Sequence, residues 1–156
     1  GEYADIWAAS TGSQSCSVVK EYPHNPSSFT QGLEAIDASG DGAAWLEGTG
    51  LYGKSKLLRV SSSGEVMASQ ELSPSLFGEG VTEVDGTVYQ LTWKEDTLIW
   101  YNASTLKELG RATGVIGQFQ RKEGWGLTDD GEERLIASDG SDKIYFLSLK
   151  NLSLLE

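Results

Sequence analysis

Three stretches of the sequence place a carboxamide, a carboxyl and an indole at equivalent positions, directly before a glycine. The residues are Gln31, Glu79 and Trp125, and the glycines that follow them are 48 and 46 residues apart. A carboxyl in a dry, aromatic surrounding has its pKa raised toward neutrality, so it can accept a proton and return it. A nearby carboxamide can orient a substrate or stabilise a developing oxyanion. These residue types are compatible with general acid–base chemistry.

Each candidate side chain also has a purely structural interpretation. A lone glutamate such as Glu79 is far more often solvated than catalytic. Trp93 and Trp125 fit the role of aromatic residues that pack between sheets. Phe29 suits a hydrophobic core as well as a site, and Gln31 could cap a turn. The residue types alone leave both interpretations open.

Other catalytic chemistries find little support in the sequence. The chain has one histidine, His24, and one cysteine, Cys16, so neither a His/Cys metal site nor a Ser-His-Asp constellation is indicated. His24 lies between Pro23 and Pro26 and is expected in a loop. No helix is expected after the glycine-containing strings, which argues against a phosphate-binding loop. We expect neither a metal nor a cofactor.

Composition and charge limit the class of partner. The 156 residues are 38% hydrophobic and 22% charged, which are globular values, and 19 glycines against 3 prolines point to many tight turns. The net charge of −11 disfavours nucleic acid and anionic membranes, because an acidic surface repels phosphate. No apolar run reaches the length of a transmembrane helix, so we expect no membrane insertion.

The elements that must position the candidate residues repeat along the chain. After each aligned glycine come two apolar-rich runs of strand length, and a polar turn then leads to a further short segment. Such segments include 63–68 and 104–109. Asp-Gly pairs at 85–86, 130–131 and 139–140 supply residues that tolerate positive φ at hairpin bends. The strand-length runs are 44–49, 89–93 and 135–139, followed by 56–60, 97–101 and 143–147.

Four strands per unit and a period in the forties are typical of β-propeller blades. We therefore expect an all-β fold, in which residues 1–156 form a partial β-propeller domain. Its repeats are placed at approximately 28–76, 77–122 and 123–156, with a partial strand or terminal segment at 1–27. Three blades are fewer than the four to eight that usually close a propeller, so the chain is expected to be part of a larger one.

Five strings then stand out by their order and spacing, and together they resemble the glutamine cyclotransferase family. This family comprises the plant (papaya) and bacterial type of glutaminyl-peptide cyclotransferase, and its fold is a five-bladed propeller. The similarity extends over about 22–150. The strings are Ser28-Phe29-Thr30-Gln31-Gly32-Leu33, Gly50-Leu51-Tyr52-Gly53-Lys54-Ser55, Phe77-Gly78-Glu79-Gly80-Val81-Thr82, Gln90-Leu91-Thr92-Trp93-Lys94 and Glu123-Gly124-Trp125-Gly126-Leu127.

The resemblance implies an activity and a set of site residues. Members convert the N-terminal glutamine of a peptide or protein into pyroglutamate and release ammonia, without a metal. By resemblance, Glu79 is the catalytic acid, Phe29 and Gln31 are first-blade substrate-binding residues, and Trp93 and Trp125 are pocket aromatics. The residues leave the location unknown, and a secretory or extracytoplasmic one is compatible with the resemblance. Further family site residues, an asparagine, a tryptophan and a lysine, have no counterpart before the end of this chain.

The reaction suits these residue types because its nucleophile is already tethered. The α-amine attacks the γ-carboxamide of its own side chain, so no Ser or Cys nucleophile is needed. One carboxyl, Glu79, can move the proton from the amine to the departing ammonia. Two alternatives stay open. The absence of the C-terminal site residues favours a non-catalytic propeller module that binds peptides or partner proteins. The tryptophans and the acidic surface would suit a sugar-binding propeller.

Overall fold

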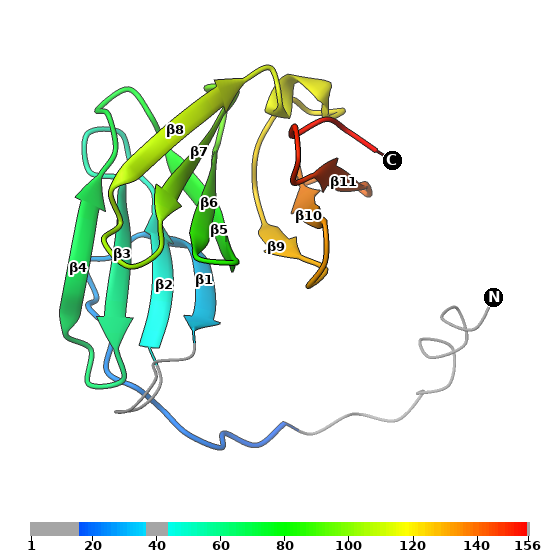
Figure 1. The fold of residues 1–156 in the computed structure, drawn as a ribbon. Helices are drawn as coiled ribbons and strands as arrows, with labels where there is room; N and C mark the ends of the chain where they lie inside the picture. Colours follow the sequence, from blue (N-terminus) through cyan, green and yellow to red (C-terminus); the bar gives the residue numbers. More distant parts are fainter. Residues whose placement is uncertain (1–15, 37–43, 156) are drawn as a thin grey trace.

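The computed structural model describes residues 16–36 and 44–155, which form three antiparallel sheets (Figure 1). Consecutive strands are neighbours in every sheet, as in the predicted blades. The first sheet contains β1 (Thr30–Ile36), β2 (Ala44–Thr49), β3 (Lys56–Ser61) and β4 (Val66–Glu71). The second contains β5 (Gly78–Val84), β6 (Thr87–Thr92), β7 (Thr97–Asn102) and β8 (Glu108–Thr113). After the 3-10 turn η1 (Ile116–Gln118), the third contains β9 (Leu127–Asp129), β10 (Arg134–Ser138) and β11 (Ile144–Ser148).

The first strands of the sheets, β1, β5 and β9, lie in the middle of the molecule, where β5 contacts both β1 and β9 (Figure 1). A Cβ atom on Gly80 would lie 2.5 Å from both the backbone nitrogen of Leu127 and the carbonyl oxygen of Trp125. One on Gly32 would lie 2.7 Å from the nitrogen of Val81. The Gly80 N–H donates to the Trp125 carbonyl at 2.8 Å. The repeated glycine therefore allows the close approach that brings the preceding residues together.

The hairpin turns follow the chemistry of their residues. Val84 pairs with Thr87 across a two-residue turn, in which Asp85 and Gly86 both have positive φ, 48° and 79°. This is the pattern of a type I′ turn, whose twist matches that of the flanking strands. At the other two Asp-Gly pairs, the positive φ falls on the glycine alone. The turn positions predicted from the sequence are confirmed.

Two hydrophobic clusters fill the spaces between the sheets. Both consist mainly of apolar strand residues, and residues of the connecting segments add to them, so each sheet buries a face against the next. The cluster between the first and second sheets includes Leu46, Leu57, Val81, Val88, Ile99 and Tyr101. The cluster between the second and third includes Leu91, Leu98, Ile116, Phe119, Leu135 and Leu147.

The fourth strands differ from expectation in where they begin. The expected segments 63–68 and 104–109 open with turns, so β4 and β8 start only at Val66 and Glu108. In the second case the side-chain oxygen of Asn102 accepts two backbone N–H groups of the turn, which is an Asx turn. This local hydrogen bonding competes with pairing and delays the strand.

Within the described residues, the third sheet has three strands, whereas four were expected in each unit. An isolated antiparallel bridge between Leu147 and Leu154 follows β11 at the outer edge. The chain therefore returns along β11 at this point, with this bridge as the pairing within the described residues.

Candidate functional site

All five side chains proposed from the sequence line one cavity of about 400 Å³. They come from the starts of β1, β5 and β9 and from the residue that follows β6. Because the starts of the three inner strands lie at the same end of the sheets, residues far apart in the sequence share this cavity. Its lining residues are Phe29, Gln31, Phe77, Glu79, Trp93, Trp125 and Gly126.

Glu79 is the ionisable group of the cavity, and only 7% of its surface is exposed. Burial raises the pKa of its carboxyl to about 7, and the negative charges of Glu95 and Glu123 act in the same direction. Gln31 Nε2 donates a hydrogen bond to Glu79 Oε1 at 2.8 Å, which opposes the rise in pKa. A carboxyl with this pKa is divided between its two protonation states at neutral pH.

Phe77 forms the centre of the aromatic wall, although it is not among the five site residues expected from the sequence. Its ring centroid lies 5.5 Å from that of Trp93 and 6.2 Å from that of Phe29. A Cβ atom on Gly50 would lie 2.3 Å from the Phe77 ring, so the glycine makes room for it. The repeat could have identified Phe77, because it precedes Glu79 by two residues as Phe29 precedes Gln31.

Glu95 supports this wall from the side of the cavity. Its Oε2 accepts the backbone N–H of Phe77 at 3.2 Å, and its Oε1 accepts the hydroxyl of Tyr52 at 2.5 Å. The hydrogen bond to Glu95 raises the pKa of Tyr52 to about 12, so the phenol remains a donor. No sequence pattern indicates this role of Glu95, because the role depends on a turn of the first sheet meeting a turn of the second.

Glu123 contacts both tryptophans of the cavity. Its Oε2 accepts the indole N–H of Trp125 at 3.0 Å and that of Trp93 at 3.1 Å. These two hydrogen bonds, the one from Trp125 first, lower the pKa of Glu123 below its usual value. The carboxylate therefore stays ionised beside Glu79.

The β10–β11 turn supports Trp125. A Cβ atom on Gly140, whose φ is 73°, would lie 2.7 Å from the indole ring, so the ring packs directly on this turn. The preceding Asp139 is fully buried. Burial alone would raise its pKa, but hydrogen bonds from Ser141, the Arg121 N–H and Tyr145 lower it to about 2. The ionised Asp139 thus ties the turn to the segment that leads into Trp125.

The remaining sequence expectations concern metals and membranes. Within residues 16–36 and 44–155, no three His, Cys, Asp or Glu side chains form a group suited to a metal ion. His24 lies in a loop, where its Nε2 is 2.9 Å from Glu47 Oε1. The part of the chain that the structure describes contains no helix with the length and apolarity needed to cross a membrane.

The meandering sheets and their shared central cavity define the chain as a β-propeller protein. A sequence model described as glutamine cyclotransferase matches residues 3–155, so the chain belongs to the glutamine cyclotransferase family. A glutaminyl-peptide cyclotransferase of Arabidopsis thaliana is 34% identical over 148 residues, which cover 89% of this chain and 43% of that protein. The family resemblance inferred from the five strings is confirmed.

Solved structures agree with this assignment. The glutaminyl cyclase of Myxococcus xanthus matches with a TM-score of 0.72 and 26% identity, over 90% of this chain and 54% of that one. The WD40 repeats of RRP9 match with a TM-score of 0.59 at 13% identity, over 85% of this chain and 39% of that one, which shows a shared fold. The chain thus spans about half the length of the two cyclases that it matches.

Proposed function

We propose that this chain supplies an acid–base site for the cyclisation of N-terminal glutamine to pyroglutamate, with release of ammonia. The observation that carries the proposal is the state of Glu79. It is a buried carboxyl in an aromatic cavity, its pKa is raised to about 7, and one of its oxygens is held by Gln31. Membership of the glutamine cyclotransferase family supports the choice of reaction.

In the proposed reaction, the peptide amine attacks the δ-carbon of its own glutamine side chain. A new C–N bond closes the five-membered ring, and the amine proton passes to Glu79. Glu79 then returns this proton to the original amide nitrogen, whose bond to carbon breaks, and ammonia leaves. One carboxyl serves both transfers, which requires a pKa near neutrality. Neither transfer calls on a metal.

The neighbouring side chains suit the geometry of these steps. Gln31 occupies Oε1 of Glu79, and no hydrogen bond within the described residues engages Oε2, which is the oxygen we assign to proton transfer. Phe29, Trp93 and Trp125 would hold the substrate folded back and exclude water from it.

The test is ammonia release from a glutamine-initiated peptide, with the Glu79→Gln variant as the matched comparison. We expect turnover that falls at least about 100-fold in the variant, since removal of a general acid–base costs that much or more. Equal turnover in both proteins would remove Glu79 from the mechanism. Peptide binding with no pyroglutamate in either protein would instead identify a binding module.

A further inference from the structure

A single carboxylate oxygen holds two indole rings that come from different sheets. Glu123 Oε2 accepts the N–H of Trp93, which follows β6 in the second sheet, and that of Trp125, which precedes β9 in the third. Within the described residues, neither indole N–H has another hydrogen-bond partner. Rotation of either ring would break a charge-assisted hydrogen bond, which is stronger than a neutral one.

Other contacts restrict the faces of the rings but not their N–H edges. Lys94 Nζ lies 3.8 Å from the ring centroid of Trp93 and 3.6 Å from Glu123 Oε1. The Trp125 ring packs on the turn at Gly140. Glu123 is therefore the contact that sets the direction in which both N–H edges point.

Glu123 occupies a repeat position at which the first two repeats have phenylalanine. It stands two residues before Trp125, as Phe29 and Phe77 stand two residues before their partners in the first two repeats. Both phenylalanines line the cavity, whereas Glu123 is not among its lining residues and contacts the two tryptophans that are. A position that breaks the local pattern is where a functional requirement is expected.

We propose that Glu123 is a positioning residue, which fixes Trp93 and Trp125 as one rigid wall against which the substrate side chain binds. The catalytic consequence rests on the proposed glutamine cyclisation, whereas the structural part does not. Because the wall acts in binding, its loss should raise KM more than it lowers kcat. A role in folding alone would lower stability but leave KM unchanged.

The first test reads the indole groups directly and needs no turnover. In the ¹H–¹⁵N spectrum of the full chain, the indole peaks of Trp93 and Trp125, assigned with the Trp93→Phe and Trp125→Phe variants, are expected to move upfield together in Glu123→Ala. A smaller movement is expected in Glu123→Gln, which keeps an acceptor without the charge. The Trp45 and Trp100 peaks should stay in place. Two unmoved peaks would overturn the proposal.

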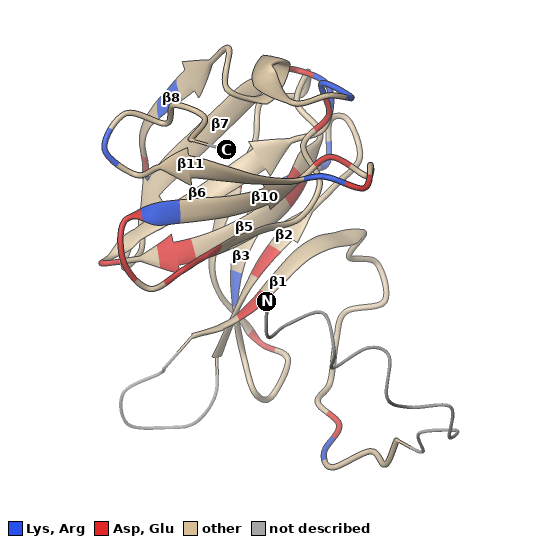
Figure 2. Ribbon diagram, turned by 90° about the vertical axis from the view of Figure 1, so that its right-hand side faces the viewer, with Lys and Arg blue, Asp and Glu red and all other residues tan. Residues whose placement is uncertain are grey.

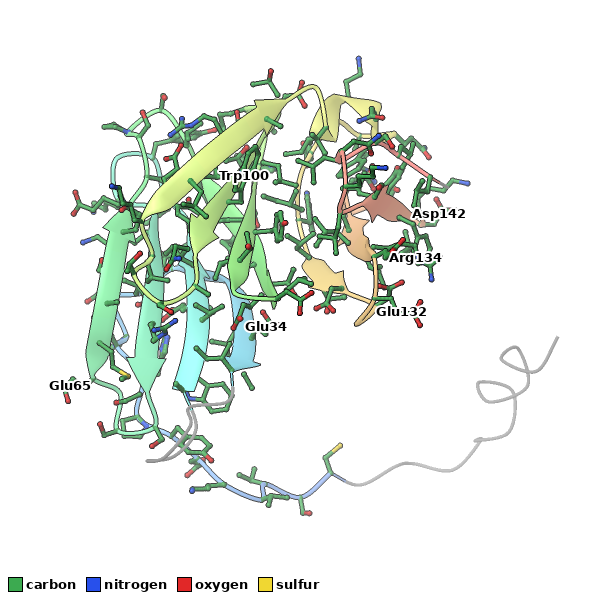
Figure 3. All side chains as sticks on the ribbon, viewed as in Figure 1. Glu34, Glu65, Trp100, Glu132, Arg134 and Asp142 are labelled. Atoms are coloured by element: carbon green, nitrogen blue, oxygen red, sulfur yellow. The ribbon has the colours of Figure 1, made fainter. Side chains whose placement is uncertain are left out.

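The second test separates this inference from the proposed function. With a glutamine-initiated peptide, Glu123→Ala should raise KM about tenfold, the loss expected for a hydrogen bond to a charged group, and Glu123→Gln should restore part of it. Glu65→Gln removes the same charge at an outward-facing turn between β3 and β4 and is expected to change nothing (Figure 3). If the unaltered chain releases no ammonia, the cyclisation proposal fails and the indole spectrum decides the role of Glu123. An unchanged KM in Glu123→Ala would contradict that role.

Discussion

At the scale of single residues, the site depends on a buried carboxyl whose ionised form makes the folded state less stable. The environment of Glu79 raises its pKa from an ordinary 4.5 to about 7, so the folded chain binds a proton that the unfolded chain releases. Between these two pH values the folded state loses stability as pH rises, because the unfolded state binds fewer protons. Above pH 7 the full loss of folding stability is reached.

The Glu79→Gln variant should therefore be more stable than the parent at pH 8, by on the order of 3 kcal/mol. The amide has nearly the same shape, keeps an oxygen for Gln31 and carries no charge to desolvate. The difference should vanish below about pH 4.5, where Glu79 is protonated in both states. Urea unfolding at several pH values measures it, and a difference independent of pH would be inconsistent with a raised pKa.

The residues of the site were predictable in part. Gln31, Glu79 and Trp125 could be found because the repeat places them before the same glycine, and Phe29 and Trp93 through the strings that contain them. The roles of Glu95 and Glu123 could not, since each depends on which side chains of another sheet face it. Such contacts between sheets leave no periodic trace in the sequence.

At the scale of elements, the approach of the inner strands determines whether these residues meet. A methyl group on Gly80 would collide with the backbone of the third sheet, at Leu127 and Trp125, which cannot move aside without separating β5 from β9. A methyl group on Gly126 would have Ser138 Oγ as its nearest neighbour, 3.1 Å away on a side chain that can rotate. The same repeat position thus tolerates a side chain in one sheet and not in another.

We expect Gly80→Ala to lower the free energy of unfolding by about 1–3 kcal/mol, the usual cost of overpacking. Gly126→Ala, the matched control, should cost clearly less. Denaturant unfolding of both variants measures the difference. Equal losses would show that glycine flexibility, rather than close strand approach, matters at this position.

The strands themselves were more predictable than their ends. Apolar runs bounded by turns predicted β2, β3, β6, β7, β10 and β11, because hairpins are local and their turn residues are recognisable. The starts of β4 and β8 were predicted too early, since turn hydrogen bonds such as those of Asn102 take residues out of the ladder.

At the scale of the whole molecule, an exposed apolar position on the first sheet is evidence that the propeller is larger. Val81 of β5 faces the first sheet and is 2% exposed, whereas Leu33, at the same repeat position in β1, is 60% exposed. An apolar position of this kind is covered when another sheet packs beside it. We therefore keep as a proposal that residues 1–156 are a partial propeller domain with repeats near 28–76, 77–122 and 123–156.

The negative charge of the molecule should influence which peptides bind. Asp and Glu outnumber Lys and Arg by 23 to 12 and are spread over strands and loops (Figure 2). Glu95 and Glu123 contact residues that line the cavity. A peptide that begins Gln-Lys should bind several-fold more tightly than one that begins Gln-Glu at low salt, and the preference should shrink toward 1 M salt as screening shortens to about 3 Å. Dissociation constants at two salt concentrations measure this. A preference unaffected by salt would point to shape instead of charge.

The most direct test of the account is the titration of the Glu79 carboxyl itself. In the full chain carrying ¹³C-labelled glutamate, the carboxyl resonance that disappears in Glu79→Gln should titrate with a midpoint near pH 7. That result would place a proton donor and acceptor in the aromatic cavity at neutral pH. A midpoint near 4.5 would mean an ordinary solvated carboxylate and would contradict the proposed acid–base role.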